Sequence, residues 1–129
     1  MIVIDTSALI AMLLLEPAAP ACSAVFERET KILISAGTVV EALIVARRRD
    51  VSEQMVELLA SPVITIVDVD ANRARLAGEA FHHWGKCIDP ASLNFADCFA
   101  YATAKEFGCP LLYIGNDFAQ TDIPSAIAP

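Results

Sequence analysis

Short, largely apolar runs rich in β-branched residues recur along this chain of 129 residues, and they constrain its fold more than any other feature. Runs of this kind, without an alternation of apolar and polar positions, are typical of strands buried on both faces of a parallel sheet. Four strands are predicted in this way: Ile2–Ile4, Lys31–Ser35, Val63–Val67 and Leu111–Ile114. Segments with helical spacing separate them, so the sequence predicts an α/β fold, a three-layer α/β/α sandwich with a mainly parallel sheet.

Six helices are predicted in the intervening segments. Thr6 and Ser7 can cap the first, Ser52 the fourth and Asn94 the sixth, and Gly108 supplies the last helix with its C-terminal stop. The predicted helices run from Thr6 to about Leu15, then over about 18–28, 36–49, 53–60, 70–84 and 94–107. No linker or repeat interrupts the pattern, and we therefore expect a single domain over residues 1–129.

The charge balance bears on the partners of the chain. Sixteen acidic residues against nine basic ones give a net charge of −7, and 56% of the residues are hydrophobic. The apolar content excludes intrinsic disorder. The acidity argues against a generic polyanion-binding protein, because affinity for phosphates normally comes from Lys and Arg. The meaning of the acidic surplus therefore depends on where the carboxylates lie.

Neither a membrane span nor a structural zinc site is expected. The most apolar run, Ala8–Leu15, is far shorter than the roughly 20 residues of a membrane helix and lacks the flanks of a signal peptide, so we expect a cytoplasmic protein. No two cysteines form a C-x-x-C pair, and the two histidines, His82 and His83, are adjacent. We expect free thiols, with Cys22 and Cys98 in the core and Cys87 in a loop.

Acidic residues stand at special positions relative to the predicted strands. Asp5 ends the first strand and Asp117 follows the fourth, while Glu41 lies in the first half of the helix after the second strand and Asp97 in the first turn of the sixth helix. Sites of parallel sheets form beyond the carboxyl ends of the strands, so these four acids can converge there, with Asp122 as a fifth. Converging carboxylates repel one another unless a divalent cation neutralises them, and such cations catalyse phosphodiester hydrolysis.

Each acid taken alone also has an ordinary structural interpretation. Asp5 could cap the first helix, Asp97 could form a capping box with Asn94, and Asp117 could be a turn residue. Glu41 is harder to explain in this way, because its neighbours in the sequence are apolar. The common placement of the acids at one sheet edge is what favours a site.

Three segments then show a family resemblance. Ile2–Ala8, which reads IVIDTSA, is similar to the first motif of PIN-domain nucleases; Leu93–Ala102 resembles the block around their third acid, and Leu112–Phe118 the block around the fourth. Thr121-Asp122 is a frequent continuation, and Glu41 occupies the second acidic position. The short single-domain form resembles the VapC toxins of bacterial VapBC toxin–antitoxin pairs.

The resemblance implies an endoribonuclease dependent on Mg²⁺ or Mn²⁺. Asp5, Asp97 and Asp117 would bind metal directly or through water, Glu41 would complete the site and help order the water at the metal, and Asp122 would be a peripheral ligand. In addition, Thr6 or Ser7 could hydrogen-bond the Asp5 carboxylate. The family further implies an RNA substrate, a homodimer and inhibition by a cognate VapB-type antitoxin whose C-terminal segment covers the active-site groove.

One segment departs from the family pattern. Relatives often carry a Gly-Lys-Gly-Arg-His stretch before the third acid, whereas residues 85–89 here read GKCID, so Lys86 alone keeps the basic character. Lys86 could contact RNA, and Arg47 and Arg48 could do so as well, although Arg47–Arg49 is more simply a solvated helix end. His82–Trp84 could stack on a base but fits a helix terminus better, and the wide apolar stripe of the first helix, up to Leu15, could meet a partner.

Two other classes of function compete with the nuclease hypothesis. The first is a catalytically silent PIN-like module that only sequesters a peptide or an RNA. The second is a phosphatase or phosphotransfer domain with Asp5 as the nucleophile, which the sequence disfavours. Haloacid-dehalogenase-like enzymes need an acid at position 7, where this chain has Ser7, and receiver domains need one at position 4, where it has Ile4.

Overall fold

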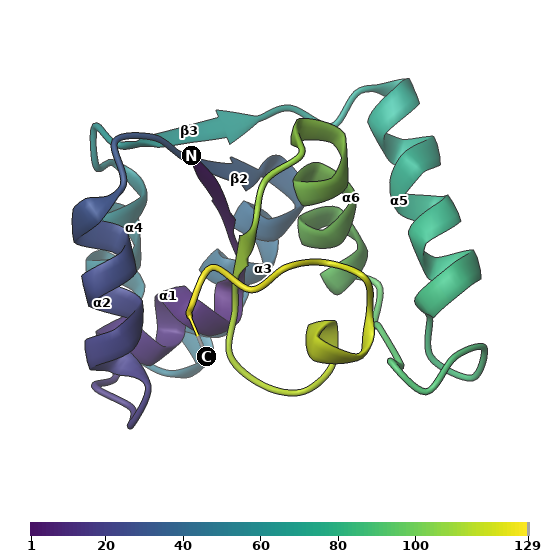
Figure 1. Cartoon of the computed structure of the whole chain (residues 1–129). Coiled ribbons are helices and arrows are strands. Elements are labelled where there is room, and N and C mark those ends of the chain that lie inside the picture. The colour runs from purple at the N-terminus through teal and green to yellow at the C-terminus, as the bar shows by residue number, and fades with distance from the viewer. Residues whose placement is uncertain (129) are drawn as a thin grey trace.

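A wholly parallel four-stranded sheet, in the order β3-β2-β1-β4, forms the centre of the computed structural model, which describes residues 1–128. The predicted α/β class is confirmed (Figure 1). Ile2 of β1 pairs with Ile32 of β2, and Ile4 pairs with Leu112 of β4. The strands are β1 (Ile2–Ile4), β2 (Ile32–Ser35), β3 (Ile64–Val67) and β4 (Leu111–Leu112).

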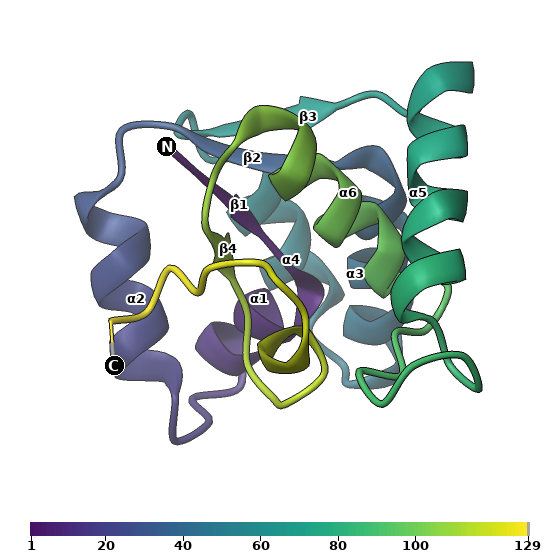
Figure 2. The same ribbon diagram turned by 45° about the vertical axis from the view of Figure 1, so that its right-hand side comes forward.

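The helices cover the two faces of the sheet, and a separate apolar core fills each side. The alternation of side chains along β1 explains the division, since Ile2 and Ile4 enter one core and Val3 enters the other. The first core packs against α1 to α4 and the second against α5 and α6, which lie side by side in Figures 1 and 2. The helices are α1 (Thr6–Leu13), α2 (Ala19–Arg28), α3 (Ala36–Arg48), α4 (Ser52–Leu59), α5 (Ala71–Trp84), α6 (Asp97–Phe107) and the short 3₁₀ helix η1 (Phe118–Gln120).

Two predicted element boundaries differ from the structure for clear reasons. Strand β4 stops at Leu112 instead of Ile114, because its neighbour β1 ends at Ile4 and the chain then turns into α1. Helix α4 begins at Ser52 itself, with Val51 as its N-cap and no side-chain capping bond, so Ser52 does not cap it as predicted.

The C-terminal segment forms a loop that closes on the rest of the fold. After β4 it passes through η1 and returns across β4, where Ser125 bridges to Leu111 (Figures 1 and 2). Phe118 is buried and packs against Tyr113, with their ring centroids 5.2 Å apart. The loop therefore brings residues 113–123 alongside the carboxyl end of β4 and the side of α6.

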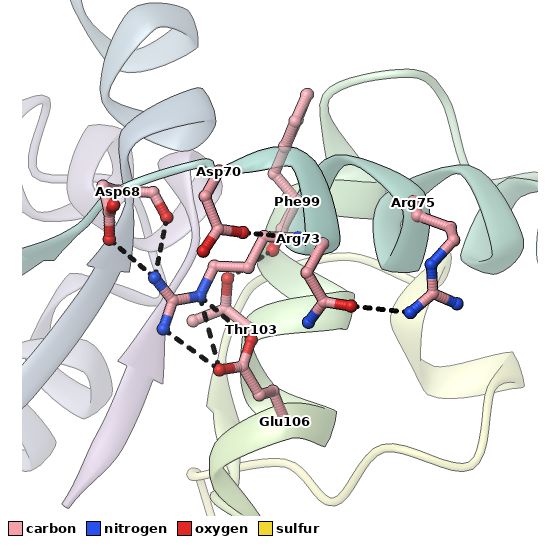
Figure 3. A network of polar contacts seen from close by, with 8 residues as sticks. Asp68, Asp70, Arg73, Arg75, Phe99, Thr103 and Glu106 are labelled. Carbon is pink, nitrogen blue, oxygen red and sulfur yellow. Dashed lines mark hydrogen bonds and ion pairs between the residues drawn. The ribbon is translucent and has the colours of Figure 1, made fainter.

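A cluster of paired charges, which we call the Arg73 cluster, joins α5 to α6 and to the end of β3 (Figure 3). The Arg73 guanidinium donates to both carboxylate oxygens of Glu106, at 3.1 Å each from Nε and Nη2, and to Asp68 Oδ1 at 2.6 Å. Asp70 caps α5 by accepting the Arg73 amide. Each acid in this cluster thus has a cation or a backbone N–H as its partner.

Other expectations for the chain are also met within the described residues. Cys22 and Cys98 are buried and Cys87 is exposed, and all four cysteines are free thiols. No helix among residues 1–128 is both long enough and apolar enough to cross a bilayer.

Candidate active site

Three acids from distant parts of the sequence meet in one open depression at the carboxyl edge of the sheet. Asp5 arrives from the end of β1, Glu41 from the second turn of α3 and Asp97 from the first position of α6. The depression is lined by Asp5, Thr6, Ser7, Ile10, Glu41, Val45 and Asp97. The convergence expected for these three acids is thus seen in the structure.

The Asp5 carboxylate has one oxygen in use and one without a partner. Its Oδ2 accepts hydrogen bonds from the Ser7 amide at 3.0 Å and from the Ser7 hydroxyl at 2.7 Å, so Asp5 is the N-cap of α1. Asp5 is only 3% exposed, and its Oδ1 is buried with no hydrogen-bond partner in the described part of the chain. A buried, unpartnered carboxylate oxygen is costly, so Oδ1 is a candidate ligand atom.

Asp97 divides its oxygens in the same way. The Asn94 side chain accepts the Asp97 amide at 2.8 Å, and Asp97 Oδ2 accepts the Asn94 amide at 3.0 Å. This reciprocal pair is the predicted capping box, although the regular helix begins only at Asp97. No hydrogen bond among residues 1–128 engages Asp97 Oδ1. Capping one helix and facing the depression are therefore compatible roles for a single carboxylate.

Glu41 is half-buried on the face of α3 that turns toward α1. The Thr6 hydroxyl donates to the Thr38 carbonyl of α3 at 3.5 Å and lies close enough to the Glu41 carboxylate to lower its pKa. Of the two hydroxyls predicted to support the first acid, the Ser7 hydroxyl bonds the Asp5 carboxylate, whereas the Thr6 hydroxyl bonds the Thr38 carbonyl.

Burial and mutual repulsion disfavour the ionised forms of these acids. Burial raises the pKa of Asp97 to about 7, and the charges of Asp5, Glu41 and Asp117 add to the effect. Burial also raises the pKa of Asp5 and that of Glu41, and the hydrogen bonds from Ser7 and Thr6 oppose it only in part. Ile10 and Val45 contribute apolar walls to the depression. None of the ion pairs found among residues 1–128 involves these acids.

Asp117 lies near these acids but does not line the depression. It is exposed in the turn after β4, immediately before η1, and its charge raises the pKa of both Asp5 and Asp97. The Ser7 hydroxyl connects the two regions, because it donates to Asp5 and accepts the Ile114 amide at 3.0 Å. The start of the Asp117 turn is thereby fixed relative to the first acid.

Asp122 lies apart from the other acids. Its Oδ1 accepts from the Tyr101 hydroxyl at 2.5 Å and its Oδ2 from the Lys105 ammonium at 2.9 Å. Both oxygens are occupied by groups of α6, and Asp122 does not border the depression. This placement argues against the predicted role of Asp122 as a peripheral metal ligand, and the sequence did not single out Tyr101. The recurrence of polar residues every four positions on α6, at 97, 101 and 105, was the available signal.

The predicted RNA-contacting residues are exposed and do not line the depression. Lys86 is exposed in the loop between α5 and α6, and Arg47 and Arg48 are exposed at the end of α3. Seven residues make almost two full turns, so Arg48 shares a helix face with Glu41 at about 10 Å along the axis. At the end of α5, Trp84 is half-buried and donates to the Tyr101 hydroxyl at 2.9 Å. This contact agrees with a helix terminus rather than a base-stacking platform.

The donor set agrees with a hydrated divalent cation. Within residues 1–128, no three His, Cys, Asp or Glu side chains are arranged so that they could hold a metal ion together. A closed cage of protein ligands is therefore absent from the described residues. Mg²⁺, however, usually takes one or two carboxylates and keeps several waters. Asp5 and Asp97 line one depression, and each has a carboxylate oxygen without a hydrogen bond in the described residues, so the pair is suited to that mode of binding.

The chain is similar to known proteins over its whole length. The PIN domain family model matches residues 2–124. Ribonuclease VapC30 of Mycobacterium tuberculosis is 39% identical over 130 residues, which cover 98% of this chain and 99% of that protein.

Solved structures show the same fold. The Mycobacterium tuberculosis toxin VapC20, described as cleaving the sarcin–ricin loop, aligns over 100% of both chains with a TM-score of 0.82 at 18% identity. A toxin–antitoxin complex from Klebsiella pneumoniae contains a chain that aligns with a TM-score of 0.71 at 19% identity, over 95% of this chain and 93% of that one.

Proposed function

This chain belongs to the PIN-domain family, among the VapC ribonucleases, and we propose that it hydrolyses RNA phosphodiester bonds as a Mg²⁺- or Mn²⁺-dependent endoribonuclease. We further propose that it acts as the toxin of a type II toxin–antitoxin pair. The observation that carries the proposal is the depression in which Asp5, Glu41 and Asp97 meet, and no cationic side chain of residues 1–128 forms an ion pair with them.

Each acid has a distinct part in the proposed reaction. Asp5 and Asp97 would hold the cation through the oxygens that helix capping leaves free, and Asp117 would act from the rim through water. When bound, the cation would lower the pKa of a water and stabilise the developing charge on the phosphate. Glu41 has a raised pKa and is half-buried, so it is suited to accept a hydrogen bond from the attacking water and orient it.

Other side chains would position the reacting groups. Ser7 holds the Asp5 carboxylate from two directions, which fixes the direction of the unpartnered Oδ1. On the substrate side, Arg48 and Lys86 are the exposed cations that could neutralise RNA phosphates next to the acids. Because the site itself is acidic, we expect RNA to bind weakly without the metal.

Cleavage of labelled ribosomal and transfer RNA by the purified chain tests the proposal. We expect cleavage with Mg²⁺ or Mn²⁺, none in excess EDTA, and none with Asp5→Asn, which keeps the shape of the cap but weakens the ligand. Asp50→Asn is the matched control, because Asp50 is exposed at a positive φ of 60° that Asn tolerates. Equal cleavage by the wild type and Asp5→Asn would overturn the mechanism. A chain that never cleaves RNA, yet retains a partner after Asp97→Asn, would be a binding module.

An antitoxin and a second copy are the partners we propose. An acidic depression with apolar walls suits a basic segment of a VapB-type antitoxin, which would compete with the metal and RNA. We expect co-purification with such an antitoxin to suppress cleavage. For the homodimer, we propose an interface of exposed apolar side chains. Val40, Leu43 and Ile44 of α3 are exposed, and Phe95, two residues before α6, is 77% exposed. Sedimentation equilibrium would measure the mass in solution, and a strictly monomeric chain would contradict this part of the proposal.

A further inference from the structure

We infer that Asp122 is a positioning residue: bound to Tyr101 and Lys105 of α6, it fixes the loop that carries Asp117 relative to the helix that carries Asp97. The inference deepens the proposed function, on which it rests, because it explains how an acid on an exposed turn is kept at the site. We call the contacts of Asp122 with Tyr101 and Lys105 the Asp122 clamp.

The loop around Asp117 is anchored at both of its ends. At the first end, the Ile114 amide donates to the Ser7 hydroxyl, which also holds Asp5. At the second end, eight residues later, Asp122 is held by α6. Between the two anchors, Gly115, Asn116 and Asp117 are all exposed. The Asp117 carboxylate is therefore positioned through its backbone, by these anchors and by the buried Phe118 beside it, and not by packing of its own side chain.

Short contacts inside the loop transmit the second anchor to Asp117. The Thr121 amide and hydroxyl both donate to the Phe118 carbonyl, at 3.0 Å and 2.7 Å, and the Gln120 amide donates to the Asp117 carbonyl at 3.3 Å. Phe118 is buried against Tyr113. A shift of Asp122 would therefore move η1 and the turn before it as one unit.

The two halves of the clamp differ in burial, and so in expected strength. Tyr101 is 7% exposed, and its hydroxyl also accepts from Trp84, so three side chains from α5, α6 and the loop meet at one oxygen. Burial and the Asp122 carboxylate raise the pKa of Tyr101 to about 12, so the phenol keeps the proton that it donates. The Lys105–Asp122 pair has side chains 48% and 51% exposed, and water weakens it.

A double-mutant cycle on Mn²⁺ binding, measured by isothermal titration calorimetry, tests the inference. Asp122→Ala and Tyr101→Phe should each weaken Mn²⁺ binding by about tenfold, as is usual for groups that orient metal ligands. Lys105→Gln should weaken it by less than about twofold, because that half of the clamp is solvated. Glu79→Gln, which breaks the exposed Arg75–Glu79 pair at 3.0 Å, is the matched control and should leave binding unchanged.

The decisive comparison is made in the background of Asp117→Asn. If Asp122 acts through Asp117, adding Asp122→Ala to Asp117→Asn should produce no further loss of Mn²⁺ affinity. A further tenfold loss would show that Asp122 acts on the metal directly or through the general stability of the fold, and it would overturn the inference. Wild-type affinity in both Asp122→Ala and Tyr101→Phe would overturn it as well.

Amide hydrogen exchange provides a readout that needs no metal. In Tyr101→Phe, which is less disruptive than Asp122→Ala, the Gln120 and Thr121 amides should exchange about tenfold faster while those of β1 keep their wild-type rates. Unchanged exchange at Gln120 and Thr121 would contradict the clamp even if the alanine variant failed to fold. If the wild-type chain binds Mn²⁺ but never cleaves RNA, the proposed function is refuted and the Asp122 clamp is not. If the chain binds no Mn²⁺, the exchange rates of the Gln120 and Thr121 amides alone test the clamp.

Discussion

Two clusters of charge lie on this small molecule, and they differ in how their acids are neutralised. In the Arg73 cluster, one guanidinium donates to both carboxylate oxygens of Glu106 and to the carboxylate and the carbonyl of Asp68, so the cluster carries its own cation (Figure 3). Around the depression, Asp5, Glu41 and Asp97 face one another, and the described residues place no Lys or Arg in an ion pair with them. The first cluster holds three elements together, whereas the second leaves a deficit of positive charge.

The two clusters differ in how much their carboxylates cost the free energy of folding. A carboxylate paired with Arg costs little in the fold, and its partner is always present. A buried carboxylate without a partner opposes folding, because burial favours its neutral form. A ligand can make up this deficit, and this is the physical basis of our proposal that the depression binds a divalent cation.

Neutralising one acid of the depression should separate function from stability most clearly. Asp97→Asn keeps the shape of the capping box but removes a ligand, so we expect cleavage to fall by about 100- to 1,000-fold, as when a preorganised electrostatic group is lost. The same substitution relieves the repulsion among the acids, so the metal-free protein should become more stable. Initial cleavage rates and urea unfolding in EDTA would measure the two effects. A variant that lost both activity and stability would indicate that Asp97 serves the fold alone.

The pH dependence of unfolding should reveal the same deficit. The pKa of Asp97 is about 7 in the fold against 3.8 for the free group, and those of Asp5 and Glu41 are also raised. The folded state therefore binds protons that the unfolded chain has released, and the stability contributed by these acids is lost as the pH rises through about 7. In EDTA, we expect on the order of 2 kcal/mol less stability at about pH 8.5 than at about pH 5.

The control for this experiment is the response to Asp97→Asn and to the cation. The substitution should flatten the pH profile, and added Mg²⁺ should restore stability at the higher pH because it binds the ionised form. A wild-type protein that became more stable with rising pH in EDTA would refute the assignment of unpaired acids to the depression.

Breaking the Arg73 cluster should have the smallest effect on chemistry and act on the fold alone. Arg73→Met removes the bonds to Glu106 and Asp68, so we expect the melting temperature to fall by several degrees while the cleavage rate per folded molecule stays at the wild-type level. Arg75→Met is the matched control, since the exposed Arg75 side chain bonds Glu79 and Asn72 of its own helix and joins no other element in the described residues. A loss of cleavage in Arg73→Met at temperatures where it is folded would contradict the contrast between the two clusters.

The local and the functional interpretations of the acids apply to the same residues but to different oxygens of each carboxylate. Asp5 was expected either as a helix cap or as a ligand, and the structure shows Oδ2 capping α1 while Oδ1 has no partner. Asp97 likewise caps through Oδ2 in a box with Asn94. The sequence could not distinguish a helix cap from a ligand, because the two oxygens of one carboxylate can take different partners. A helix cap also fixes the direction of the oxygen that remains.

By itself, the sequence determined the strands and helices, the parallel sheet and the edge at which Asp5, Glu41 and Asp97 meet, because burial periodicity and helix capping are local properties of the chain. Only the tertiary structure decided which group each polar atom contacts. Asp122 follows Thr121 in a segment that the sequence suggested as part of the acidic site, yet it binds Tyr101 and Lys105 of α6 and does not line the depression. The same holds for Ser7, whose hydroxyl joins Asp5 to an amide 107 positions later in the chain. Such contacts depend on the angle at which a loop returns to the sheet, and packing at long sequence separation sets that angle.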